Sequence, residues 1–584
     1  MAGSPRLGRP PGSDLALAVA VATGRAITEE WRGSDLHRWL SNRPAPDGFA
    51  LQPRDYRPAY VEAGRGVLAG VFALGGATLA VGAGGDPWDR PSPDRPFAEA
   101  LHRFDWLPDL IAVGPEGAAE ALRLVLEWRR LFGRWNSFAW DPKVMARRVY
   151  NLACAGPSLT ARASDAETAQ IAADLARQAR DLLRCRFGPG AAESATAAAV
   201  AGVALKGAAG TKLLDRALER LTRTLPRAVR PDGAHASRKA STTLELLFDL
   251  QTLDEAMAQR GLAAPEAVQR AIDGLAAAVR YFTLADGGLA TGQGGGLRSA
   301  TYVAAARALD TVGDRPLESA LGGYQRMESR RLQVFVDTTP PASGHWSPDA
   351  TATPLAIQVL VGGHRLIEFQ SGRTLETASS VQVADGRLGV EITGFPARVL
   401  GPRLANADTL VEVQRHESPG AVWLDMAHHG WSRAYGLIHQ RRLYLDLEAG
   451  DLRGEDRLTP TARAQGPDGR HFVSYALRFQ LHPGVRALVA QDRRSVLLRI
   501  PGEAEGWVLR NDGLDMDLEP APRSDRPGQQ LVLRGQRRAD SGARVRWRLS
   551  PARPAAATAS PAFTRTADLI DGEPPRVDVT SSGA

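Results

Sequence analysis

Apolar residues recur at helical spacing through the first half of the chain, between about residues 90 and 325. In residues 116–132 the side chains of Ala121, Leu124, Val125 and Trp128 form one stripe, and Gly133 supplies a stop signal. Similar segments follow at 142–155, 165–187, 191–205, 208–227, 242–260, 265–283 and 297–312. Amphipathic helices of similar length joined by short turns predict helix pairs stacked in a ring or solenoid.

After about residue 330 the period changes to that of β-strands. Alternating or continuous apolar runs of strand length occupy 333–337, 355–361, 388–392, 409–413, 443–447, 475–481, 495–500 and 545–549. Turns rich in Gly, Asp and Pro separate them, and no helical pattern intervenes. This pattern predicts an antiparallel sandwich or layered sheet assembly.

The sequence therefore predicts a multidomain protein in which an all-α region is followed by an all-β region. Its 584 residues are too many for one ordinary core. We predict an N-terminal segment (1–90) that packs on the rest, an all-α (α/α) incomplete toroid (91–328), an antiparallel β-sandwich (329–552) and a disordered tail (553–584). The tail prediction comes from its Ala, Pro, Ser and Thr content.

The composition limits the kinds of molecule that the protein is expected to bind. The formal net charge is +7, but arginines are scattered among acids and no aromatic-lined basic tract or reader motif is present, so we expect anionic partners and no nucleic acid. No stretch approaches the ~20 apolar residues of a membrane span. Residues 15–22 are a poor match to a signal peptide and favour a first helix. By that criterion the protein is cytoplasmic, although a periplasmic or envelope location stays open, and oligomeric state is unknown.

The segment Pro231–Lys239 places cations directly before an apolar helix. Thr242 and Glu245 fit a capping box at the start of that helix. Helix N-termini carry unpaired N–H groups and partial positive charge, so Arg238 and Lys239, with His235 beside them, would favour a bound carboxylate or sulfate. The alternative is a basic turn in solvent.

Several strings, in order along the chain, are typical of one protein family. They are Phe104–Leu110 (FDWLPDL), Trp140–Pro142, Ala146–Arg148, Pro231–Arg238, Asp286–Ala290, Gly323–Arg326, Gly436–His439, Arg441–Leu443, Gly454–Leu458, Arg478–Phe479 and Leu481–Pro483. Together with the switch from helix to strand, they resemble the heparinase II/III family of polysaccharide lyases, over most of the chain. The resemblance implies a toroid followed by a sandwich, and an acidic, uronate-containing polysaccharide as partner.

The chain departs from the family pattern at four motifs that would line the cleft. Lys239 stands where relatives tend to have an Asn that neutralises the substrate carboxylate. Two family histidine strings fall on Ala350–Thr353 and on Thr377–Ser380, neither of which contains histidine, and Gln293 stands at the position of a family Asn. The Gly-rich run 292–296 around Gln293 is expected to form a flexible rim loop.

A uronate lyase must neutralise the sugar carboxylate, remove the neighbouring proton and protonate the leaving oxygen. For proton transfer the histidine candidates are His345, His428 and His439, and the phenol candidates are Tyr302, Tyr324 and Tyr435. For substrate binding the candidates are His235, Arg238, Lys239, Gln293, Trp346 and Arg441. Arg441, Arg442, Glu455 and Asp456 also fit a cross-strand salt-bridge ladder. We expect no cofactor, while zinc or calcium is not excluded because no metal-ligand spacing is diagnostic.

Three functions follow from these observations. The first is a lyase that cleaves acidic glycans by β-elimination. The second is a catalytically degenerate carbohydrate-binding or envelope-assembly protein on the same scaffold. The third is a glycoside hydrolase, which needs two carboxyl groups across a cleft; Asp232, Glu245, Asp249 and Asp286 are available, but no motif pairs them.

Overall fold

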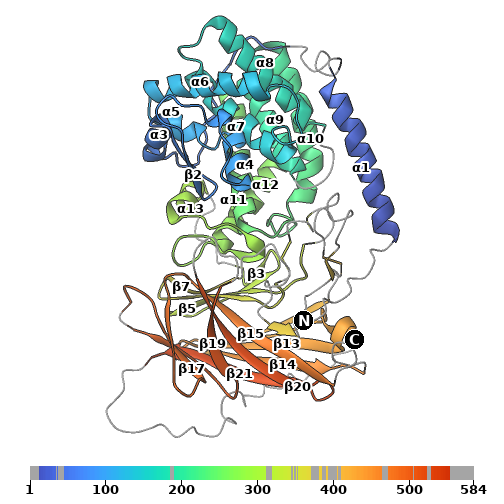
Figure 1. Cartoon of the computed structure of the whole chain (residues 1–584), viewed down its shortest axis with the longest axis vertical. Helices are drawn as coiled ribbons and strands as arrows, with labels where there is room; N and C mark the ends of the chain where they lie inside the picture. Colours follow the sequence, from blue (N-terminus) through green and yellow to red (C-terminus); the bar gives the residue numbers. More distant parts are fainter. Residues whose placement is uncertain are drawn as a thin grey trace, which may run out of the picture.

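The structure is a computed structural model. It describes residues 12–34, 36, 45–184, 190–310, 318–342, 346, 350–351, 353–369, 381–383, 390–391, 404–405, 410–462, 471–503, 505–521 and 528–552. In this part of the chain a helical body is followed by a body of antiparallel sheets, and the two lie end to end (Figure 1). The predicted order of α then β is confirmed.

The helical body contains most of the helices of the chain. Their bounds are α1 Gly12–Gly33, α3 Val61–Leu68, α4 Arg95–Arg103, α5 Leu107–Ala112, α6 Pro115–Phe132, α7 Pro142–Leu159, α8 Asp165–Leu182, α9 Ala191–Ala204, α10 Gly207–Ala228, α11 Ala240–Gln259, α12 Glu266–Phe282 and α13 Ala300–Arg307. Helix starts follow local chemistry: Ser164 and Glu167 form a capping box before α8, and Asp141 caps α7 ahead of Pro142.

The Ala-rich helix α9 lies inside the helical body and packs against α7, α8, α10 and α11. Thirteen of its fourteen residues are buried. Small side chains permit this close packing, because a Cβ on Gly202 would lie only 2.6 Å from the backbone nitrogen of Leu214 on α10. α9 therefore serves as the core around which the outer helices stack.

The start of α11 differs from the prediction. The helix begins at Ala240, two residues before Thr242, and its N-cap residue Lys239 makes no side-chain capping bond. The capping box is wrong because the Glu245 carboxylate is held by arginines from other elements. The last predicted helix, 297–312, is also shorter, at Ala300–Arg307, and residues 311 and 312 lie outside the described residues.

Part of the N-terminal segment packs on the helices. A hairpin of β1 (Val71–Leu74) and β2 (Ala77–Ala80) follows α3. Val67 and Phe72 belong to the same apolar core as the helical body. The run 15–22 lies in α1, which extends along the side of the molecule (Figure 1), and Arg32 near its end is 3.7 Å from Asp181 of α8.

The β body consists of two large antiparallel sheets whose facing sides form one apolar core. The order in one is β19-β20-β15-β7-β6-β5-β4-β3, with β8 also paired to β15, and in the other β11-β12-β13-β14-β21-β18-β17-β16. Strand bounds are β3 Ala320–Leu321, β4 Tyr324–Glu328, β5 Leu332–Asp337, β6 Ile357–Val361, β7 His364–Glu368, β8 Val381–Val383, β11 Val411–Ser418, β12 Ala421–His428, β13 Leu437–Asp446, β14 Asp451–Pro460, β15 Phe472–Leu481, β16 Arg486–Val489, β17 Ser495–Arg499, β18 Trp507–Asn511, β19 Asp515–Pro520, β20 Gln529–Arg538 and β21 Ala543–Pro551; β9 Val390–Glu391 pairs with β10 Leu404–Ala405.

The predicted start of the β body, at residue 329, can be compared with the structure. Strands β3 and β4 precede residue 329 yet pair in the same sheet as β5, so the sheet starts earlier than predicted. The predicted strands 388–392 and 409–413 and the predicted tail 553–584 fall partly or wholly outside the described residues.

Arg238 joins the helical body to the β body. Its backbone has φ +63°, in the left-handed region, which directs the side chain away from α11. The guanidinium pairs with Asp337 at the end of β5 and donates to the carbonyl oxygens of Gly322, Gly323 and Pro340. Tyr324 closes the contact, with its hydroxyl donating to the Arg238 carbonyl at 3.1 Å. The junction between the two bodies is therefore polar, buried and specific.

Among the described residues, no helix combines the length and the apolar composition needed to cross a membrane.

Candidate functional site

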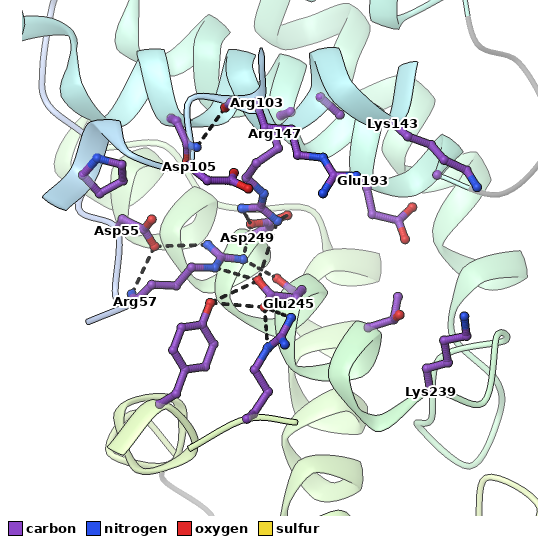
Figure 2. A pocket seen from close by; sticks show the side chains of 18 of the residues that line it. Asp55, Arg57, Arg103, Asp105, Lys143, Arg147, Glu193, Lys239, Glu245 and Asp249 are labelled. Carbon is purple, nitrogen blue, oxygen red and sulfur yellow. Dashed lines mark hydrogen bonds and ion pairs between the residues drawn. The ribbon is translucent and has the colours of Figure 1, made fainter. Parts of the chain in front are cut away.

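A cavity of about 590 Å³ opens in the helical body beside the junction. Its lining comes from the segment before α3, the turn between α4 and α5, and helices α7, α9, α11 and α13, with Trp346 from the segment that leads into the sandwich. Figure 2 shows charged side chains from all sides directed into it. A concave site of this size, built from several elements, is the expected form of a small-ligand or saccharide site.

One wall of the cavity is a network of ion pairs around α11. Arg57 donates to Glu245 at 2.8 Å and to Asp249 at 2.6 Å, and Arg147 of α7 donates to both oxygens of Asp249 at 2.9 and 3.2 Å (Figure 2). Asp55 completes it by accepting from Arg57 at 3.1 Å. Glu245 and Asp249 share one helix face because they are four residues apart. Glu245 and Asp249 could be noticed from the sequence, but only the fold brings Arg57 to them.

Glu245 also accepts from the side opposite Arg57. Arg298 donates to it at 3.0 and 3.1 Å, and the Tyr302 hydroxyl donates at 3.1 Å. Burial alone would raise the pKa of Glu245, but the charges of Arg57, Arg298 and Arg147 lower it to about 2. Burial and the Glu245 charge raise the pKa of Tyr302, which keeps its proton. Of the three phenol candidates, Tyr302 is the one on the cavity, and there it can donate a proton but not accept one.

Asp105 and Asp109 are carboxyl groups on the cavity whose pKa is raised, chiefly by burial. Asp105 follows α4, where Phe104 takes a left-handed conformation (φ 60°) and ends the helix. Burial, opposed by the charges of Arg103 and Arg147, raises the pKa of Asp105 to about 6. Asp105 was not predicted as a site residue, although it lies in the FDWLPDL string that resembles the family. The carboxyl groups of this cavity thus differ widely in proton affinity.

Lys143, Glu193 and Lys239 lie together on another side of the cavity (Figure 2). Among the described lining residues, cations and acids are equal in number: Arg57, Arg103, Lys143, Arg147, Lys239 and Arg298 against Asp55, Asp105, Asp109, Glu193, Glu245 and Asp249. The cations before α11 favoured an anionic ligand, but the cavity as a whole has no excess of positive charge, since each sign is present six times.

The structure divides the predicted substrate-binding residues into two groups. Lys239 and Trp346 line the cavity, and His235 lies directly behind its wall, with its ring 4.8 Å from that of Trp346. Arg238 does not line it, because its guanidinium is taken up by the junction. Gln293 is also at the junction and donates to Asp337 at 2.6 Å and to Thr353 at 2.9 Å. It is 1% exposed, so the predicted flexible rim loop is wrong at this residue.

The predicted catalytic histidines His428 and His439 lie in the core of the sandwich. Nδ1 of His439 is 3.0 Å from Nε2 of His428, and Nε2 of His439 is 2.8 Å from Asp456. Arg441 donates to Asp456 at 2.7 Å and to the carbonyl oxygen of Leu355 at 2.7 Å, and Trp547 donates to Asp456 at 2.9 Å. The two histidines and Arg441 are at most 1% exposed. The side chains of the two histidines are enclosed in this conformation, which does not support the prediction that they transfer protons to a glycan; Arg441 is equally buried, although it borders a second cavity of about 210 Å³ on the sandwich.

Burial is the main cause of the pKa shifts of the two histidines in this sandwich network. Burial, together with nearby positive groups, lowers the pKa of His428 well below its usual value. Burial also lowers the pKa of His439, although Asp456 opposes the shift. Arg441 and Asp456 are register partners on β13 and β14, so the interpretation of these strands as a salt-bridge ladder is confirmed.

His345, the third catalytic candidate, lies outside the described residues, as do the positions 377–380 of one substituted family string. Across the described ranges no group of three or more His, Cys, Asp or Glu side chains is arranged to hold a metal ion.

Comparison with known proteins gives the family. Residues 379–548 match the family model described as heparinase II/III-like, C-terminal. FtsZ-localized protein C of Caulobacter vibrioides (strain NA1000 / CB15N) is 44% identical over 561 residues, which cover 93% of this chain and 97% of that protein. The chain belongs to the heparinase II/III-like family.

Solved structures agree on the fold. A crystal structure of heparinase III matches with a TM-score of 0.67 at 13% identity, over 89% of this chain and 90% of the other. Heparan sulfate lyase HepC of Pedobacter heparinus, in a mutant form, matches with a TM-score of 0.54 at 14% identity, over 86% of each chain. These matches confirm the helical domain followed by antiparallel sheets. At such identities they show the fold alone.

Proposed function

We propose that the protein is a carbohydrate-binding, envelope-assembly member of the heparinase II/III-like family that holds a polysaccharide in the helical-domain cavity. The observation that carries the proposal is the cavity itself. It is lined by the aromatic side chains Tyr60 and Trp346 and presents both signs of charge. Aromatic faces and charged hydrogen-bonding groups are the usual means of holding sugar rings.

The pairing of cationic with acidic side chains in the cavity indicates which kind of glycan it would bind. Arg57, Arg147 and Arg298 are already paired with carboxylates, so a heavily sulfated chain would compete with Glu245 and Asp249 for them. A glycan with few anionic groups, or with both acidic and amide groups, meets no such conflict. This favours an envelope polysaccharide over a heparin-like chain.

The relative in Caulobacter supports the envelope-assembly part of the proposal. It is FtsZ-localized by its name and similar over nearly the whole length. By this likeness we infer that the protein acts where FtsZ is, and that binding rather than cleavage is its contribution there.

A glycan-binding measurement tests the proposal. Purified protein is expected to bind at least one polysaccharide of a broad envelope and uronate panel and to release no ultraviolet-absorbing unsaturated ends. Lys239→Ala, on the cavity wall, is expected to weaken binding about tenfold, the effect of losing one charged hydrogen bond. Lys212→Ala, on an exposed face of α10 away from the cavity, is the matched control. No affinity for any polysaccharide would reject the proposal.

A lyase remains the second candidate, favoured by the full-length fold match to heparinase III. On this hypothesis Tyr302 would protonate the leaving oxygen, because its pKa is raised and its hydroxyl faces the cavity. Unsaturated product from a uronate glycan, lost in Tyr302→Phe while binding is retained, would establish it over the binding-only function.

A further inference from the structure

Three side chains beside the cavity form a series of polar contacts that neither candidate function uses. The Ser237 hydroxyl lies 2.7 Å from Nδ1 of His235, and Nε2 of the same ring lies 3.3 Å from a carboxylate oxygen of Glu193. Ser237 and Glu193 line the cavity, and the His235 ring between them is fully buried. The series runs from the segment before α11 to the first turn of α9.

The hydrogen-bond donors around His235 show which of its ring nitrogens accepts and which carries a proton. The backbone N–H of Ser237 can only donate, and it points to Nδ1 of His235 at 3.2 Å, so Nδ1 carries a lone pair. The other ring nitrogen, Nε2, then carries a proton and faces Glu193 at 3.3 Å. Burial alone would raise the pKa of Glu193, but its contact with His235 holds the pKa below its usual value, so Glu193 is a carboxylate.

The Ser237 hydroxyl must then donate its hydrogen to Nδ1. Its oxygen also accepts from the backbone N–H of Lys239 at 3.4 Å. A serine whose proton points to a histidine lone pair, with a carboxylate on the far ring nitrogen, has the roles of a nucleophile, a general base and an orienting acid. The two ring nitrogens are exchanged relative to the serine protease arrangement.

We propose that Ser237, His235 and Glu193 form an acyl-transfer site, and that its substrates are acyl esters small enough to enter the cavity, such as O-acetyl groups on a saccharide. The Ser237 oxygen bonds to the acyl carbon while its proton passes to Nδ1 of His235. The ester carbon–oxygen bond then breaks, and the leaving alkoxide takes that proton from Nδ1. Water attacks the acyl-serine by the same proton path, which releases the acid and restores the hydroxyl.

The start of α11 supplies groups for the negative charge that develops on the acyl oxygen. The first intrahelical bond runs from the N–H of Thr243 to the carbonyl of Lys239 at 3.1 Å. The N–H groups of Ala240, Ser241 and Thr242 therefore have no acceptor within the helix. They follow Ser237 by three to five residues, and the partial positive charge of a 20-residue helix adds to them.

A fluorophosphonate probe tests the site without any glycan, so the result does not depend on the proposed polysaccharide function. The probe is expected to label the folded protein once, at Ser237, as mapped by mass spectrometry. Ser237→Ala is expected to lose labelling completely. It keeps the fold, because the backbone N–H still donates to His235. Ser158→Ala removes a hydroxyl on α7 that donates to Gln52 and does not line the cavity, and it is expected to label like wild type.

The other two members are tested by the rate of labelling and by release of nitrophenol from p-nitrophenyl acetate. His235→Gln is expected to slow both reactions more than 100-fold, and Glu193→Gln about tenfold, with thermal melting used to confirm that each variant is folded. The proposal is overturned if folded wild type is not labelled under conditions that label a known serine hydrolase. It is equally overturned if labelling falls on another residue, or if His235→Gln labels at the wild-type rate.

Discussion

The cavity and the sandwich core hold similar clusters of charged side chains with different consequences. Glu245 is held by Arg57 and Arg298 at the edge of an open cavity, whereas Asp456 is held by Arg441, His439 and Trp547 with almost no exposed surface. Each carboxylate has its pKa lowered by its cationic neighbours despite burial. What separates them is access, because Glu245 itself lines a cavity of about 590 Å³, whereas Asp456 lies behind the strands and only its partner Arg441 borders a smaller cavity of about 210 Å³.

This difference has a structural origin. The sandwich residues His439, Arg441 and Asp456 sit at fixed positions on paired strands, and their side chains point between the sheets, where apolar neighbours fill the remaining volume. The cavity residues come from separate helices, and small residues such as Gly190 and Ala197 leave room among them. Polar networks that are fully enclosed specify a fold, and those that line space can bind.

The largest expected effect is on the stability of the sandwich. Asp456→Ala would leave Arg441 buried without its carboxylate, and we expect a loss of about 3–5 kcal/mol in the free energy of unfolding. Urea denaturation measures it. Asp540→Ala breaks an exposed pair with Arg538 and is expected to leave the urea midpoint unchanged. A small loss for Asp456→Ala would mean that the enclosed network is not structural.

The second largest expected effect is on the stability of the junction between the helical body and the β body. Arg238→Ala removes the ion pair with Asp337 and several bonds to carbonyl oxygens, while Gln293 and Thr353 still donate to the Asp337 carboxylate. We expect a loss of about 2–3 kcal/mol, with the helical and β bodies unfolding in separate transitions. Calorimetry distinguishes this from a single, merely shifted transition, which would show that Arg238 does not couple the two bodies.

The two regions should respond to acid with opposite signs. The pKa of His428 is well below 6.5 in the folded protein, so below pH 6.5 the unfolded chain binds the extra proton and stability falls as pH falls. The pKa of Asp105 is raised from 3.8 to about 6, so as pH falls from above 6 towards 4 the folded protein binds the extra proton and stability rises.

Single substitutions separate these contributions. When the pH falls from 7 to 5, we expect His428 to lower the free energy of unfolding by about 1–2 kcal/mol and Asp105 to raise it by about 1–2 kcal/mol. His428→Gln should abolish the first change, and Asp105→Asn should abolish the second. Urea denaturation at the two pH values measures both. The same sign for the two variants would contradict the assignment of His428 to an enclosed network and Asp105 to a cavity wall.

Much of the fold, but only part of the site, could be predicted from the sequence. The helical and strand periods report local burial, and they gave the order of the two bodies and most helices. The site depends on contacts between distant residues, such as Arg57 with Asp249, 192 positions apart, which no local pattern encodes. His428 and His439 were misassigned because a histidine in a family string does not reveal whether its side chain faces solvent or the core. Lys239 and Trp346 do line the cavity, and their roles there stay a prediction.

The most direct test of the central claim compares one substitution in each region by polysaccharide affinity. Thr242→Trp would fill the cavity from α11, and His439→Gln would alter the enclosed network while keeping its hydrogen-bonding capacity. With both variants folded, calorimetric titration with the polysaccharide bound best by wild type should show affinity reduced more than tenfold for Thr242→Trp and within twofold of wild type for His439→Gln. Unchanged affinity in Thr242→Trp, with a large loss in His439→Gln, would place the ligand in the sandwich and contradict the account.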